Sequence, residues 1–462
     1  MPEIPAVLEK VIKIFEKNGV EYGDVRFDSS TSTGISKNVA EENFASGSIQ
    51  GYHIRVLRDS EWRAISISGV EKGVILSSAK KLTKFSPTLK EKSSYSKLKP
   101  WTFKKRYKCR KDPADIDLRE KIELVRGLYK RLKGFDERIV NAGARYADDI
   151  VEKHFMNTEG SELYYRAPLI RVVLVSFAKF GKNVQVDHMA HGGFGVGYEF
   201  VDRLDIEEDC RSVSKGAVEL LDADRAPSGK LPVVLDAEMA GLIAHESFGH
   251  GLEADQVLRN RSFLSDMLGK RVASNSVTIV DNSSYESAYG SYPFDDEGVR
   301  SRKNTLVERG ILKSFLHSRD SACNFNVPST GNGRAESFSH KIFVRMSNTY
   351  FEKGEWKLQE MLEDIDYGVY LIKGSHGMED PLGGGLQISS MKGRLIEHGE
   401  PTKLLRSISL TGNVLELLRN VDAVGRDFKL DPGTCGKGFE DFVRVTSGGP
   451  SLRVKEAIVG GG

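Results

Sequence analysis

The sequence has few cysteines, no long apolar run and almost no net charge, and each of these absences excludes a class of protein. Its four cysteines, Cys109, Cys210, Cys323 and Cys435, lie far apart in the 462-residue chain and form no CxxC pair. This spacing excludes the disulfide framework of a small secreted protein. The most apolar stretch, residues 172–178, has the length of a strand and is far shorter than the ~18 residues that a membrane-spanning helix needs.

The start of the chain and its charge balance exclude further classes of protein. Residues 1–19 alternate apolar and charged side chains at helical spacing, and they lack the continuous apolar segment of a secretory signal. The 67 basic and 65 acidic residues give a net charge of +2, so no general attraction to nucleic acid or to a membrane surface follows. We expect a folded cytoplasmic protein without membrane contacts.

Hydrophobic periodicity predicts an α+β fold of two domains. Residues 1–226 are predicted to form a mixed α/β domain that encloses substrate or contacts another subunit. Residues 227–462 are predicted to form a mostly antiparallel β domain that carries one motif helix after Asp236. The boundary falls in ADRAPSGKLP, which has the composition of a linker. Helices are predicted near 3–18, 71–84, 118–132 and 204–221, and strands near 138–145, 150–156 and 162–178.

The motif helix contains a His-Glu-x-x-x-His pattern formed by His245, Glu246 and His250. In a regular α-helix, residues five positions apart point about 140° away from each other. Two histidines on one metal therefore require a π-bulge between them or a helix end at Gly249. We expect Glu246 to lie on the inward stripe of the helix, where a carboxylate needs a partner such as a metal-bound water.

A catalytic zinc ion usually takes three protein ligands and one water. The residues leave three candidates for the third ligand, which are Cys435, Glu253 and Asp255. Cys435 ranks first, because it is expected in a glycine-lined turn beside Lys437, where exposure together with a nearby positive charge would favour its thiolate. Glu253 ranks second.

Other polar residues are candidates for contacts outside the metal site. Glu253, Asn332 and Arg334 could bind substrate, and Gly331–Arg334 lacks the Lys-Ser/Thr of a phosphate-binding loop. The acidic run 295–297 suits an acidic turn, or a contact with a substrate amine, better than a calcium site, which needs six or more oxygens.

Residues 80–111 form a basic segment dotted with aromatic side chains, which supports an alternative function. Lysines can bind phosphates and aromatic rings can stack on bases, so the protein could be a regulator or scaffold that binds nucleic acid or a protein partner here, with a structural metal. Such runs are more often solvated loops or subunit contacts, so nucleic acid is the less favoured partner.

Several motifs together resemble the TldD/PmbA family, and within it the TldD-type zinc metalloproteases. The motifs occur in family order across residues 231–462 and include AHESFGHGLEAD, GNGRAESF, GMEDPLGGG and GTCGKG. Two features are not matched to the family pattern, namely His376 and the length of the basic segment 80–111.

The resemblance implies a zinc (Zn2+) peptidase with ligands His245, His250 and Cys435, and with Glu246 as the base that activates water. It also implies a dimer that encloses the site in a chamber for unfolded or extended peptides. The partner would be a homologous TldE/PmbA-type subunit or a second copy of the chain. Because this chain keeps the His-Glu motif, it resembles the active member of such a pair.

Overall fold

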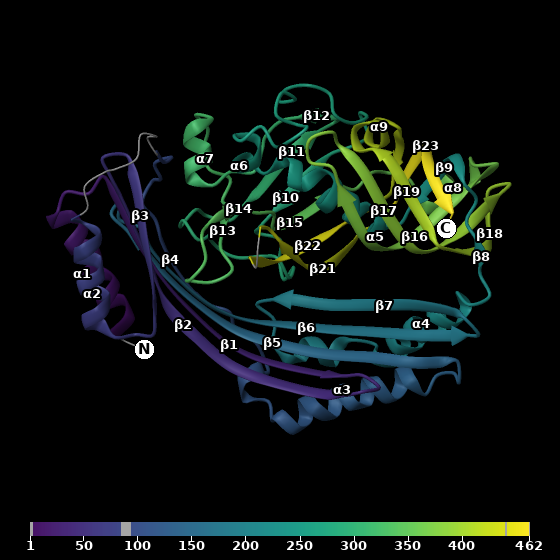
Figure 1. Ribbon diagram of the computed structural model, residues 1–462, viewed down its shortest axis with the longest axis horizontal. Helices are drawn as coiled ribbons and strands as arrows, with labels where there is room; N and C mark the ends of the chain where they lie inside the picture. Colours follow the sequence, from purple (N-terminus) through teal and green to yellow (C-terminus); the bar gives the residue numbers. More distant parts are fainter. Residues whose placement is uncertain (1–2, 85–93, 439–440, 462) are drawn as a thin grey trace.

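The computed structural model describes residues 3–84, 94–438 and 441–461, and it confirms the α+β fold class. A long, curved N-terminal sheet forms the lower half of Figure 1, and the C-terminal strands form the upper half. Among the described helices, none has the length and apolar character required to cross a membrane.

The N-terminal sheet has seven strands in the order β3-β2-β1-β5-β6-β4, with β7 paired to β6 beyond the end of β4. Helices α3 and α4 pack on the face turned away from the C-terminal half, whereas α1 and α2 pack at the other end of the sheet. The elements are α1 Glu3–Lys17, β1 Tyr22–Lys37, β2 Glu42–Arg58, β3 Glu61–Ser68, α2 Lys72–Leu82, β4 Thr102–Arg106, α3 Leu118–Lys133, β5 Ile139–Asn157, β6 Glu162–Phe180, β7 Asn183–Phe194 and α4 Ile206–Glu219, with short 3-10 helices at Pro113–Asp115 and Tyr198–Arg203.

Strand β5 differs from the sequence prediction, which placed two separate strands at 138–145 and 150–156. The chain continues through Ala147 and Asp148 because both neighbours, β1 and β6, stay in register with it there. Asp148 is buried, and its carboxylate accepts a hydrogen bond from Lys121 Nζ at 2.6 Å. This buried pair lets a polar stretch remain inside a strand.

The C-terminal half contains a six-stranded sheet in the order β12-β11-β10-β15-β22-β21, in which β21 is an edge strand. A separate pair, β13 and β14, lies beside it. The strands are β10 Ile279–Asn282, β11 Lys303–Glu308, β12 Ile311–Leu312, β13 Gly333–Arg334, β14 Phe343–Val344, β15 Asn348–Phe351, β21 Lys429–Gly436 and β22 Phe442–Gly449.

The third sheet has the order β16-β9-β23-β19-β17-β18-β8, with β20 paired to β23. Because β16 also pairs with β17, the strands β16, β9, β23, β19 and β17 close into a ring. The strand of this sheet that comes first along the chain, β8, ends next to the domain division predicted at residue 226. That division stays a prediction. The strands are β8 Asp224–Arg225, β9 Gly229–Leu235, β16 Tyr367–Glu379, β17 Gly385–Glu397, β18 Glu400–Arg406, β19 Ile408–Asn413, β20 Val421–Val424 and β23 Leu452–Gly461.

The motif helix lies between these two C-terminal sheets. Its first segment, α5, contacts β22 and β15 on one side and β16 and β9 on the other. Gly241 permits this close packing, because a Cβ there would come within 2.4 Å of the Gly448 backbone nitrogen. The helices of this half are α5 Ala237–Leu242, the π-helix η3 Ile243–Gly249, the 3-10 turn η4 His250–Leu252, α6 Ala254–Val257, α7 Arg319–Asn324, α8 Leu358–Glu363 and α9 Val414–Arg419.

Polar contacts fix the start of the motif helix to both halves of the molecule. Asp236 caps α5 by accepting a hydrogen bond from the Met239 N–H at 2.8 Å, and it also accepts one from the Lys373 N–H at 3.0 Å. The Lys373 ammonium in turn contacts Asp187 Oδ1 of β7 at 2.6 Å. The N-terminal sheet therefore helps to set the position of the helix that carries the two histidines.

Candidate metal centre

The π-helix brings His245 and His250 onto a common face, as expected from the first of the two alternatives, a π-bulge between the histidines. Hydrogen bonds from residue i to i+5 widen the turn, so side chains five positions apart lie above each other. The two imidazole centroids are 5.3 Å apart, with the rings nearly perpendicular. The π-helix ends at Gly249 and His250 begins a 3-10 turn, so the structure combines the two alternatives.

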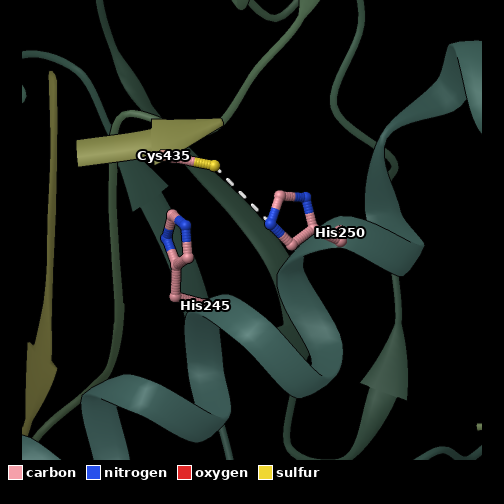
Figure 2. A group of neighbouring side chains, drawn as sticks. All are labelled: His245, His250 and Cys435. Atoms are coloured by element: carbon pink, nitrogen blue, oxygen red, sulfur yellow. Dashed lines mark hydrogen bonds between the residues drawn. The ribbon is translucent and has the colours of Figure 1, made fainter. Parts of the chain in front are cut away.

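Cys435 approaches the two rings from β21, 185 residues further along the chain (Figure 2). Its Sγ lies 3.5 Å from His250 Nε2, and the ligand atoms of the three residues all lie within 4.8 Å of one another. Zinc bonds of ~2.0–2.3 Å in a tetrahedral site place neighbouring ligand atoms about 3.3–3.8 Å apart. The group is therefore close to the dimensions of a metal site.

The setting of Cys435 differs from the sequence prediction in two respects. The residue lies in a strand instead of a turn, and it is buried, with 4% of its surface exposed. Burial alone would raise the pKa of the thiol, but the adjacent His245 and His250 lower this pKa to about 4. The histidines, and not Lys437 as expected, therefore favour the thiolate.

The donor set suits a divalent metal. A thiolate and two imidazoles are ligands that zinc prefers. His245 Nδ1 is buried without a hydrogen-bond partner within the described residues, an arrangement that costs free energy unless another group satisfies the nitrogen. The described residues thus fit a metal ion held by His245, His250 and Cys435.

Glu246 lies beside this group on the solvent side. Its carboxylate oxygens are 4.0 Å from His245 Nε2 and 3.7 Å from His250 Nε2. The side chain is 32% exposed, so it does not lie on the buried stripe as the sequence suggested. The carboxylate is therefore adjacent to both imidazoles and partly open to solvent, the position that a proton-transferring group beside a bound metal would need.

Glu253 contacts His250 at Nδ1, the ring nitrogen that faces away from Cys435. Its Oε2 lies 3.5 Å from His250 Nδ1 and accepts a hydrogen bond from Lys437 Nζ at 2.8 Å. Lys437 also contacts Asp255 at 2.8 Å and the Val344 carbonyl at 2.9 Å. Burial opposes ionisation of Glu253, but Lys437 and His250 together lower the pKa of its carboxyl to about 2. A carboxylate on the second nitrogen of a ligating histidine fixes the ring and raises its basicity.

We expect the substitution Lys437→Met to weaken metal binding by about 10–100-fold, the usual cost of losing a group that holds a metal-ligating histidine in place. The methionine keeps the apolar stem but leaves the buried Glu253 without its counter-ion. Zinc affinity measured by competition with a chelator checks this result. Lys429→Met is the matched control, because Lys429 lies on β21 and pairs with Glu238 and Asp431 instead. Equal affinities of the two variants would contradict the assignment.

The other candidate site residues are spread around the centre. Glu253 is 1% exposed and engaged with His250 and Lys437, which favours a supporting role over contact with substrate. Asn332 is fully buried and hydrogen-bonds Asp281 and the Arg345 carbonyl. Arg334 donates to two backbone carbonyls and lines a cavity of about 340 Å³ between the two halves. His376 lies on β16 and contacts Ser375 and Ser389, outside the metal group.

The acidic run 295–297 joins the two halves of the molecule. Asp296 pairs with Arg26 and Lys153 of the N-terminal sheet, and Glu297 pairs with Arg55. The run forms a turn, as the sequence suggested, in which the Gly298 N–H donates to the Asp295 carbonyl. All three acidic side chains are buried, and Asp296 and Glu297 make the contacts with the N-terminal sheet, whereas Asp295 accepts hydrogen bonds from backbone N–H groups of its own half.

The basic segment is also used for packing. Residues 85–93, including Phe85, lie outside the described residues. In the rest, Trp101, Phe103 and Tyr107 pack into an apolar cluster with the N-terminal sheet and Phe294. Tyr95 packs against Tyr22 in a tilted arrangement and against Trp62 edge to face. These rings are therefore engaged within the protein and do not form a platform for bases, so the nucleic-acid alternative is not favoured.

The chain belongs to the PmbA/TldD metallopeptidase family. Models described as the PmbA/TldA metallopeptidase central domain and C-terminal domain match residues 111–222 and 228–461. A metalloprotease of Methanocaldococcus jannaschii is 37% identical over 96% of this chain and 98% of its own length. A metalloprotease of Methanothermobacter thermautotrophicus is 36% identical, with 96% of each chain covered.

Two solved structures share the fold. A putative modulator of a DNA gyrase from Thermotoga maritima has a TM-score of 0.80 and 23% identity, and the match covers 99% of this chain and all of that one. TldE from Thermococcus kodakarensis has a TM-score of 0.76 and 20% identity, with 98% of this chain and all of that chain covered. At these identities the likeness concerns the fold alone.

Proposed function

We propose that this metallopeptidase uses zinc held by His245, His250 and Cys435, with Glu246 as its general base. The observation that carries the proposal is the convergence of two imidazoles and a buried thiolate within 4.8 Å of one another, next to a partly exposed carboxylate. Structural zinc sites are closed by four protein ligands, whereas catalytic sites keep one position open. Three ligands with a neighbouring free carboxylate favour catalysis.

The residues of the chain then have distinct roles. A bound zinc ion would supply Lewis acidity, activating water near neutral pH and polarising a peptide carbonyl. Glu246 accepts the proton of the attacking water and passes it to the leaving amine. Glu253 and Lys437 hold the His250 ring in the orientation that presents Nε2 to the metal.

Removal of the metal should abolish peptide hydrolysis. We expect the purified protein to contain about one zinc ion per chain, to lose hydrolysis of an unstructured fluorogenic peptide after chelation, and to regain it when zinc is added. Metal analysis and the peptide assay on the same samples check this prediction. Full activity in protein shown to be free of metal would contradict the proposed function.

The substrate and partner belong to the same proposal. We infer that the protein acts in the cytoplasm on unfolded or extended peptides inside a dimeric chamber, with a TldE/PmbA-type subunit or a second copy as its partner. The fold shared with a protein named TldE supports a homologous partner. The four free cysteines suit a reducing compartment.

A further inference from the structure

A cavity of about 610 Å³ lies at the junction of the two halves, next to the Lys437 group that supports His250. One wall comes from β2 and β3 of the N-terminal sheet, with Trp62 and Ala64 facing the space. The opposite wall comes from α6 and from Ile342, Phe343 and Val344 in and before β14. Its volume falls within the ~300–1,000 Å³ typical of small-molecule sites.

The cavity wall is directly connected to the group that supports His250. Asp255 and Val344 line the cavity, and both contact the Lys437 ammonium, at 2.8 Å and 2.9 Å. The Phe343 ring centroid lies 5.8 Å from the same ammonium. Lys437 contacts Glu253, and Glu253 contacts His250. Because the Lys437 and Glu253 side chains lie between the cavity wall and His250, and an extended peptide advances ~3.3 Å per residue, the side chain that enters the cavity would be a few residues away from the scissile bond.

The chemistry of the walls favours an apolar occupant. Trp62, Ile342 and Phe343 are large apolar side chains that remain partly exposed around the space. The charged groups in the inner wall already have partners, because Arg55 pairs with Asp24 and Glu297, and Asp255 pairs with Lys437.

The remaining polar groups do not call for a charged ligand inside the cavity. His53 Nδ1 lies 3.0 Å from both Ser66 Oγ and the Phe338 carbonyl oxygen, so this imidazole is engaged within the protein. Arg259, Asp320 and Lys341 are exposed to water and carry charges of both signs. His340 Nδ1 lies 2.8 Å from Ser337 Oγ, and its Nε2 lies 3.9 Å from the Glu336 carboxylate. The inner surface therefore offers apolar contact, and the titratable groups that line it have partners within the protein or lie in water.

We propose that this cavity is a specificity subsite that takes a large apolar side chain of the peptide substrate, so that β3 of the N-terminal domain takes part in substrate selection. The inference rests on the proposed peptidase function. Burying a phenylalanine-sized side chain in such a site should tighten binding by about 10–100-fold relative to glycine at the same peptide position.

The test compares binding of two labelled peptide sets to the full-length, metal-loaded Glu246→Gln variant, which should not cleave them. One set carries a single phenylalanine and the other a single glycine, and in each set this residue is moved stepwise along an otherwise polar sequence. Affinity is measured by fluorescence anisotropy. We expect one position at which phenylalanine binds at least about tenfold more tightly.

Two further substitutions in the same background locate this preference. Ala64→Trp fills the cavity from an exposed position on β3 and should remove the preference, with the glycine peptides bound as before. Val70→Trp is the matched control, since it adds the same ring at a residue that is 48% exposed and lies outside the cavity wall. Val70→Trp should retain the preference.

The outcomes separate the inference from the proposed function. Equal binding of the two sets at every position, or a preference that persists in Ala64→Trp, overturns the subsite. If the wild-type protein cleaves peptides but shows no such preference in kcat/KM, only the subsite fails. If the preference and its loss in Ala64→Trp are seen but no peptide is hydrolysed, the cavity binds as proposed and the peptidase function fails.

Discussion

Replacing Glu246 with glutamine is expected to reduce peptide hydrolysis by about 10²–10⁴-fold, the usual contribution of a general base. Glutamine has nearly the same shape but cannot accept the proton of the attacking water at neutral pH. Because Glu246 lies beside the three proposed ligands and is not one of them, the variant should keep its zinc. The measurement is kcat on an unstructured peptide together with the metal content of the same preparation.

A matched control separates this effect from a general change of charge. Glu416→Gln makes the same chemical change at an exposed position of α9 and should retain full activity. A Glu246→Gln protein that holds zinc and turns over at the wild-type rate would show that another group activates the water. A variant that loses its zinc would show that Glu246 is a ligand, which is a different role from the one proposed.

The second large effect is expected from Cys435→Ser, which should lose both zinc and activity. A serine hydroxyl stays protonated at neutral pH, whereas the Cys435 thiol has a pKa of about 4 beside the two histidines and is present as thiolate. If the ~10–16 kcal/mol of a four-ligand zinc site is shared equally, one ligand contributes about 3 kcal/mol, or at least a hundredfold in affinity.

Cobalt substitution gives a direct readout of this ligand. A thiolate bound to cobalt produces a charge-transfer absorption in the near ultraviolet, which the wild-type protein should show and Cys435→Ser should lack. Cys323→Ser should retain the absorption, because Cys323 lies in α7 and outside the metal group. An unchanged spectrum and zinc content in Cys435→Ser would remove the thiolate from the proposed site.

The sequence was sufficient for those parts of the site that depend on local spacing. The interval of five between His245 and His250 demanded a departure from regular α-helix, and the π-helix supplies it. The amphipathic patterns of residues 3–18 and 118–132 likewise predicted α1 and α3, since their apolar stripes follow a single period.

The environment of each site residue could not be predicted in the same way, because it depends on contacts distant in sequence. Cys435 was expected in an exposed turn, but pairing of β21 with β22 places it in a buried strand. The association of Lys437 with Glu253 and Asp255 was missed. The sequence indicated this association only indirectly: Lys437 follows Cys435 by two residues, and Glu253 and Asp255 follow His250 by three and five.

The aromatic residues of the basic segment show the same limit. Their composition suited nucleic acid, yet Trp101 and Phe103 pack against Phe294 of the other half. A pattern of cations and rings does not reveal whether the rings face solvent or a neighbouring domain. The parallel pairing of β4 with β6 decided this, and no local feature of the segment indicated it.

The distance of 185 residues between His250 and Cys435 has a consequence for stability. A metal ion held by the proposed ligands would cross-link the motif helix and β21, two chain segments that are far apart in the unfolded chain. Such an ion would bind the native state in preference to the unfolded chain and would stabilise it by mass action, by about 4 kcal/mol when free metal exceeds the dissociation constant a thousandfold. Metal starvation would therefore lower the amount of folded protein as well as its catalytic competence.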